Sequence, residues 1–370
     1  MTMGGGKTKI FRAIDFFCGA GGMTFGLTLA GIKVVAGIDI DEECKDTYET
    51  NNLESKFIHS DIKELTIKQL KKLDIERNDG SMIFAGCSPC QYWTQIHTEK
   101  ERSLETKHLL EDFQKFVSFF MPGFIVVENV RGILINKDES KLTEFLHFLQ
   151  KNNYGVHYDI IDAMHYGVPQ KRKRFLLVAS RVDKEIKLPK ADKGNGLTVK
   201  DFIGVDNGFA SIGAGHVDKS DFLHMTAGLS EKNIKRLKLT PHDGGTRLAW
   251  KDDLELQIHA YKDKDSTYKD TYGRMFWDKP APTITTKFHS ISNGRFAHPD
   301  EDRGISLREG ATLQTFPKTY VFKGSGIGSM ARQIGNAVPP ELARRIGVTI
   351  RSQVTDKVES RKVKGDYVHV

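Results

Sequence analysis

From residue 9 to residue 180, short runs of β-branched and aromatic residues alternate with longer amphipathic stretches. This alternation is typical of βαβ units, in which successive strands lie parallel in one sheet and helices cover its faces. The expected strands are 10–17, 33–39, 56–59, 81–86, 124–130, 156–162 and 174–180, and the expected helices are 23–31, 41–51, 106–120 and 141–150. Asp41 is placed to cap the second helix. The sequence therefore predicts an α/β fold built on a mostly parallel sheet.

The alternation ends at Arg181, and the following stretch is rich in glycine, histidine and charged residues with weak periodicity. A chain of 370 residues has the length of about two domains. We expect a first domain over 8–180 and a second, smaller domain over 181–304. Helical spacing then returns, which predicts that a segment over 305–354 folds back onto the first domain and that 355–370 is a solvated tail.

Composition excludes several classes of protein. Four cysteines are too few for a disulfide scaffold. No apolar run approaches the ~18 residues that span a bilayer, and the first residues lack the apolar core of a signal peptide. We therefore expect a cytoplasmic protein with no membrane partner. The net charge of +7 favours a polyanionic partner.

A glycine-rich loop over 18–22 follows the first expected strand. Glycines let a ligand approach the backbone closely, and the start of the next helix favours a negatively charged group. Asp39 ends the second strand twenty positions after Gly19, where an acidic side chain can bind the ribose of a nucleoside. Thr24 replaces the third glycine of the dinucleotide pattern, which favours a smaller adenosyl ligand. A tight turn without a ligand is the alternative.

Three further segments could carry chemistry. Cys90 follows the fourth expected strand and could be a nucleophile, or one half of a redox pair with Cys87. Glu128 lies near the carboxyl end of the fifth strand, where it could deliver a proton. Arg172 and Arg174 alternate with lysines before the seventh strand, so both are expected on one face, suited to a phosphate or a base carbonyl.

In this order, these segments resemble the motif set of the DNA (cytosine-5) methyltransferase family, and the resemblance covers nearly the whole chain. The matching segments are Phe16 to Gly22, Asp61-Ile62, Pro89-Cys90-Gln91, Glu128-Asn129-Val130, Gln170 with Arg172 and Arg174, 308–317 and 332–340. Each is short, and the specificity lies in their number and order. The fold implied is the Rossmann-like sheet of S-adenosylmethionine-dependent methyltransferases with a target-recognition domain over 181–304.

The resemblance also implies a reaction. The Cys90 thiolate would add to C6 of a cytosine flipped out of duplex DNA, Glu128 would stabilise N3, and C5 would then take the methyl group of S-adenosylmethionine. Arg172 and Arg174 would hold the flipped base and its phosphate. No metal is expected.

The same resemblance assigns binding residues. The expected cofactor set is Phe17, Gly19, Gly21, Asp39, Ile40, Asp61, Ile62 and Asn336. Within it, Asp39 would bind the ribose hydroxyls, Ile40 the adenine face and Asp61 the adenine amino group. The expected DNA contacts are Pro89, Gln91, Arg247 and Arg274.

Two rival functions belong beside this interpretation. A tRNA-methylating branch of the family carries a Cys-Phe-Thr tripeptide in its second domain, whereas this chain has no cysteine after Cys90. A catalytically silent DNA-binding module would not need Cys90 or Glu128. The compact chain resembles the modification enzymes of bacterial restriction-modification systems, which implies a cognate endonuclease as a partner in function. We expect a monomer.

Overall fold

The computed structural model describes residues 10–87, 108–135, 137, 140–194, 196–262 and 264–365, the side chains of 354–365 excepted. Within this part of the chain, no helix combines the length and the apolar character needed to cross a bilayer.

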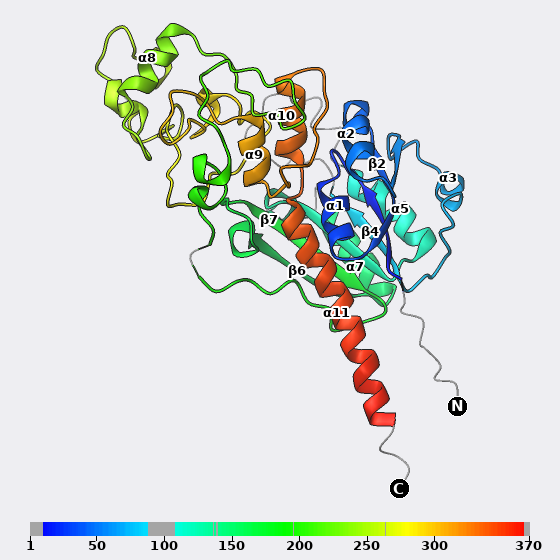
Figure 1. Ribbon diagram of the computed structural model, residues 1–370. Coiled ribbons are helices and arrows are strands. Elements are labelled where there is room, and N and C mark those ends of the chain that lie inside the picture. The colour runs from blue at the N-terminus through cyan, green and yellow to red at the C-terminus, as the bar shows by residue number, and fades with distance from the viewer. Residues whose placement is uncertain are drawn as a thin grey trace.

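A twisted sheet organises the first half of the chain (Figure 1). Its strands are β1 (Arg12–Phe16), β2 (Lys33–Asp39), β3 (Lys56–His59), β4 (Met82–Gly86), β5 (Phe124–Val130), β6 (Gly155–Asp162) and β7 (Lys173–Ser180). They lie in the order β3-β2-β1-β4-β5-β7-β6. Strands β1 to β5 are parallel to one another, and β7 runs antiparallel to both β5 and β6. The predicted α/β fold with a mostly parallel sheet is confirmed.

The four expected helices are also present, with small differences at their ends. The helices of the sheet region are α1 (Gly22–Leu29), α2 (Lys45–Asn51), α3 (Ile67–Lys71), α5 (Leu109–Phe120), α6 (Gly132–Ile135) and α7 (Leu142–Lys151). Asp41 caps a 3₁₀ turn, Glu42–Cys44, that leads directly into α2, and its side chain accepts a hydrogen bond from the backbone N–H of Glu43. The predicted cap is therefore confirmed, one turn ahead of the α-helix.

Two apolar cores cover the two faces of the sheet. One packs Phe113 of α5 and Phe145 of α7 against the strands. The other packs Leu27 of α1 and Leu342 of α11 (Pro340–Gly365) against the opposite face. A Cβ atom at Gly26 would lie only 2.2 Å from the carbonyl oxygen of Pro340, so only glycine allows α11 to approach α1 this closely. The end of the chain is thus part of the same layered core.

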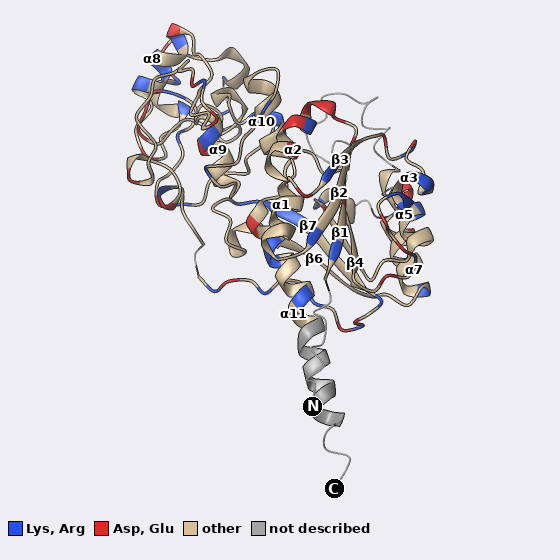
Figure 2. Ribbon diagram, turned by 45° about the vertical axis from the view of Figure 1, so that its right-hand side comes forward, with Lys and Arg blue, Asp and Glu red and all other residues tan. Residues whose placement is uncertain are grey.

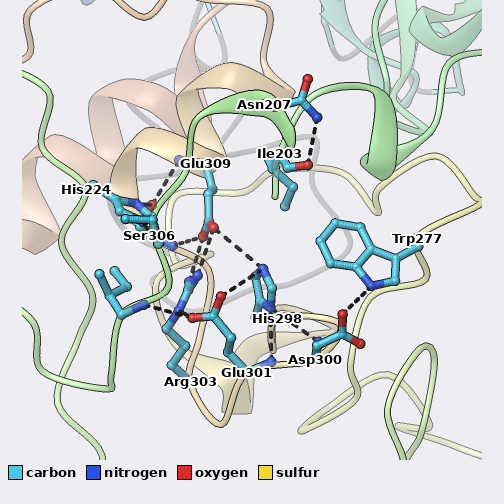
Figure 3. Close-up of polar contacts among 12 residues, drawn as sticks. Ile203, Asn207, His224, Trp277, His298, Asp300, Glu301, Arg303, Ser306 and Glu309 are labelled. Carbon is cyan, nitrogen blue, oxygen red and sulfur yellow. Dashed lines mark hydrogen bonds and ion pairs between the residues drawn. The ribbon is translucent and has the colours of Figure 1, made fainter. Parts of the chain in front are cut away.

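Between β7 and α11 the chain forms a second lobe (Figure 1). Its helices are α8 (Glu231–Leu239), α9 (Leu307–Leu313) and α10 (Ile327–Asn336). The middle of the lobe holds a buried ion pair, in which Arg303 donates to both carboxylate oxygens of Glu309 at 2.7 and 2.9 Å (Figure 3). Although burial opposes ionisation, this pairing lowers the pKa of Glu309 to about 2. The lobe is therefore organised around buried polar groups as well as apolar ones.

Candidate active site at the carboxyl edge of the sheet

Several of the residues predicted to carry chemistry lie at one edge of the sheet. The parallel strands β1, β2, β4 and β5 end at Phe16, Asp39, Gly86 and Val130. Because parallel strands present their carboxyl ends at the same edge, the glycine loop, Asp39, Cys87 and Glu128 all belong to it. Open α/β sheets bind their ligands at this edge.

The glycine loop reverses the chain between β1 and α1 with positive φ angles at Phe17 (64°), Gly19 (50°) and Gly21 (87°). Its two glycines have different surroundings. A Cβ atom at Gly21 would lie 2.6 Å from Nδ2 of Asn52 and 3.0 Å from the hydroxyl of Tyr320, whereas a Cβ at Gly19 would meet none of the described residues within 4 Å. One side of the loop is therefore packed against protein, and the other leaves room for a ligand to approach the backbone.

Asp39 is fixed beside this open side. Its carboxylate accepts hydrogen bonds from the backbone N–H groups of Gly19 at 2.7 Å and of Asp41 at 2.8 Å. Burial raises the pKa of Asp39, and these two hydrogen bonds oppose the rise. The adjacent Ile40 is 60% exposed, so an apolar side chain is left uncovered next to the carboxylate. A carboxylate, an exposed apolar surface and an accessible glycine backbone together fit the adenosyl group of S-adenosylmethionine.

The remaining expected cofactor residues occupy different environments. Asp61 follows β3 and accepts a hydrogen bond from the backbone N–H of Lys63 at 2.9 Å. Ile62 is buried in the apolar core, so its side chain supports the edge from below. Asn336 is the last residue of α10 and is exposed.

A buried network beneath the loop was not anticipated from the sequence. Oδ2 of Asp15 accepts hydrogen bonds from both the backbone N–H and the hydroxyl of Thr24, at 3.1 and 2.8 Å. The Thr24 hydroxyl continues to Tyr48, which reaches Ser55 at 2.6 Å. Burial raises the pKa of Asp15 to about 7. An acidic residue inside an otherwise apolar strand was the only sequence signal for this site.

Glu128 and Arg174 face each other across neighbouring strands. The register pairs Arg174 with Val130, and Glu128, two residues earlier, lies on the same face of β5. Nε of Arg174 is 3.1 Å from Oε1 of Glu128, and both side chains are largely buried. Among the described residues no hydrogen bond of good geometry reaches that buried oxygen, so its contact with Arg174 is an ion pair.

Arg172 has a different environment from the one expected. It is 2% exposed, and its guanidinium donates to the backbone carbonyls of Ile284 at 3.0 Å, Ala337 at 3.1 Å and Gly335 at 3.2 Å. It lies one residue before β7 begins, where strand alternation does not yet fix the side-chain direction. Arg172 therefore joins the sheet to the second lobe, in part through the end of α10. It does not share the surroundings of Arg174.

The two arginines expected to contact DNA are also buried. The Arg274 guanidinium donates to the backbone carbonyls of Leu237, Thr240 and His298. Arg247 donates to the carbonyls of Lys264 at 2.7 Å and Thr267 at 3.1 Å. Both guanidinium groups are buried on backbone carbonyls, where they hold the loops of the second lobe, and their expected contact with DNA stays a prediction.

Pro89, Cys90 and Gln91 lie outside the described residues. The chain enters their segment at the edge described above, since the backbone N–H of Cys87 donates to the carbonyl of Phe16 at 3.2 Å. The side chain of Cys87 is partly buried.

Comparison with known proteins agrees with this geometry. Residues 11–352 match the model of the family described as C-5 cytosine-specific DNA methylase. The Type II methylase M.HgiDII of Herpetosiphon aurantiacus is 38% identical over 356 residues, covering 95% of this chain and 98% of the relative. The Type II methyltransferase M.Sau96I of Staphylococcus aureus is 33% identical, covering 93% and 76%.

A solved structure of a prophage-encoded protein from Escherichia coli has the same fold, with a TM-score of 0.70 at 20% identity and coverage of 93% of this chain and 99% of that one. We conclude that the chain belongs to the C-5 cytosine-specific DNA methylase family and is a DNA cytosine-5 methyltransferase.

Proposed function

We propose that this methyltransferase is the modification enzyme of a restriction-modification system and that it works as a monomer in the cytoplasm on a fixed sequence in duplex DNA. The proposal is supported by relatives of the Type II class that match almost the full length of the chain. A cognate endonuclease would cleave the same sequence when it is unmethylated.

Residues 181–304, which form the first part of the second lobe, are the proposed reader of that sequence. The lobe adjoins the sheet and carries numerous lysines and arginines (Figure 2). Lys232, Lys235 and Lys238 of α8 are exposed. Exposed lysines suit phosphate contacts, which position DNA without specifying bases.

The proposed chemistry begins with Cys90. Its thiolate forms a bond to C6 of the flipped cytosine, the C5–C6 electron pair becomes available at C5, and Glu128 holds a proton at N3 as charge develops there. C5 would form a bond to the methyl group that S-adenosylmethionine supplies, and the electron pair of the broken S–CH3 bond would stay on sulfur, which gives S-adenosylhomocysteine. Loss of the C5 proton then restores the double bond and expels the thiolate.

The observation that carries the assignment of Glu128 is its contact with Arg174 at the edge that also holds Asp39. The cationic Arg174 fixes one oxygen of the carboxyl group, which orients the other for a base. Arg174 can also contact the base or its phosphate. Asp39, Ile40 and Asp61 would hold the adenosine, and the open side of Gly19 would admit the rest of the cofactor.

Bisulfite sequencing of genomic DNA tests the function directly. The chain is expressed in a host without cytosine methylation, and we expect complete conversion everywhere except at one cytosine of a fixed motif. Cys90→Ser is expected to abolish methylation while duplex binding in a mobility-shift assay is retained. Unmodified DNA with folded protein would contradict the proposal, and labelled methyl transfer to tRNA would then separate an RNA methyltransferase from a silent binder.

A further inference from the structure

A polar stripe on α2 and the turn before it binds the segment that leads into α10. Glu43, Thr47 and Asn51 are spaced by four residues, which places them along one helical face. Thr47 exchanges two hydrogen bonds with the backbone of Lys323, at 2.8 and 3.1 Å. Asn51 does the same with Val321, at 2.7 and 2.8 Å. Two side chains thus supply the hydrogen bonds that a neighbouring strand would give to the backbone of a segment about 270 residues further along the chain.

Glu43 continues this stripe onto α10 itself. Its carboxylate accepts hydrogen bonds from the hydroxyls of Ser325 at 2.7 Å and Ser329 at 2.5 Å, and from Nη2 of Arg332 at 2.7 Å. Nη2 of Arg332 also lies 3.2 Å from Oδ2 of Asp41. Figure 2 shows acidic residues of the α2 region beside α10. We call Glu43, Ser325, Ser329 and Arg332 the α10 clamp.

The clamp connects two parts of the cofactor edge. On one side, the backbone N–H of Asp41 holds the carboxylate of Asp39, which also accepts from Gly19. On the other side, Arg332 lies four residues before Asn336 in α10, so the two side chains share a helical face. The contacts that fix Arg332 therefore also fix where Asn336 lies relative to the turn that follows Asp39.

We propose that Glu43 is a positioning residue for the cofactor, which it serves by holding α10, and with it Asn336, against the turn after Asp39. This inference rests on the proposed roles of Asp39 and Asn336 in binding S-adenosylmethionine. The clamp adds no group to the reacting atoms. Its loss should weaken cofactor binding and leave the methyl-transfer step intact.

The experiment measures binding of S-adenosylhomocysteine to the full chain by calorimetry, together with KM for S-adenosylmethionine and kcat. Glu43→Gln and Arg332→Ala are each expected to raise the dissociation constant and KM about 3- to 10-fold, with kcat at saturating cofactor within about twofold. Arg332→Lys keeps a donor and a charge and is expected to recover part of the affinity. The matched control is Glu144→Gln, which removes an exposed carboxylate paired with Lys141 on α7 at 3.1 Å.

The outcomes separate this inference from the proposed function. If the unaltered chain binds no S-adenosylhomocysteine, the cofactor assignment fails and the clamp proposal fails with it. If the unaltered chain binds and methylates, but both clamp variants bind equally well, only the clamp proposal is overturned. A parallel fall in kcat and melting temperature without rescue by lysine would also overturn it. Should Glu43→Gln not fold, Ser329→Ala and Arg332→Ala decide the question.

Discussion

Nε of Arg174 lies 3.1 Å from Oε1 of Glu128 because β7 runs antiparallel beside β5. The register brings a cation from one strand against a carboxyl group from the other at the carboxyl edge of the parallel strands. A parallel β7 would present its first residues at the opposite edge. The reversed strand thus assembles a charged pair next to the proposed cofactor site.

Replacing Glu128 by glutamine is expected to lower kcat for methyl transfer about 10²- to 10³-fold, because the amide can donate a hydrogen bond to N3 but cannot transfer a proton to it. Duplex binding should change little. Transfer of a labelled methyl group to DNA measures the effect, with Glu111→Gln as a control at an exposed glutamate beside His108. Undiminished activity in Glu128→Gln would refute its catalytic role.

Alanine substitutions at the two loop glycines should have separable effects. Gly21→Ala places a Cβ 2.6 Å from Asn52 at a φ of 87°, so it is expected to lower the free energy of unfolding by about 2–4 kcal/mol. Gly19→Ala meets no atom of the residues that the structure describes within 4 Å and should cost only about 1 kcal/mol of backbone strain, while weakening cofactor binding. Thermal melting and calorimetry with S-adenosylhomocysteine distinguish them. If Gly19→Ala and Gly21→Ala lowered the free energy of unfolding equally, the assignment of the open side of the loop to Gly19 would be wrong.

Arg172→Ala is expected to lower the free energy of unfolding by about 3 kcal/mol, since it removes the donor to three backbone carbonyls that join the sheet to the second lobe. Urea unfolding measures the loss. Lys171→Ala, at the exposed neighbouring position, is the control. If Arg172→Ala were as stable as the control and lost only activity, a direct contact with the flipped base would be the better assignment.

Stability should also depend on the protonation of Glu309. Its pKa is about 2 in the folded chain against an ordinary value of 4.5, so the ionised carboxylate stabilises the native state above about pH 4.5, and this contribution is lost as the pH falls towards 2. Glu309→Gln should cost about 3 kcal/mol at pH 7, and the difference from the unaltered chain should shrink below pH 4.5. Denaturant unfolding at several pH values measures this difference. A constant difference from pH 7 to pH 3 would refute the assignment.

The strands, the first helices and the glycine loop follow from the sequence because each depends on local periodicity or on short-range spacing. Alternating apolar residues define a strand wherever it lies, and glycines after Phe16 make a turn whatever packs against it. The distance in sequence between Gly19 and Asp39 was enough to place both at one edge. For the same reason, the predicted cap at Asp41 is confirmed by the structure.

Only the tertiary structure decided which charged residues are free to act. Arginine is a residue type that often binds ligands. The partners of Arg172, Arg247 and Arg274 are nevertheless backbone carbonyls, contributed by segments that no local pattern specifies. The contacts of Glu43 with Ser329 and Arg332 exist only because the fold brings α10 against the turn before α2. Periodicity encodes the local path of the chain, whereas burial and long-range pairing depend on which surfaces meet, and that is set by the packing of the whole molecule.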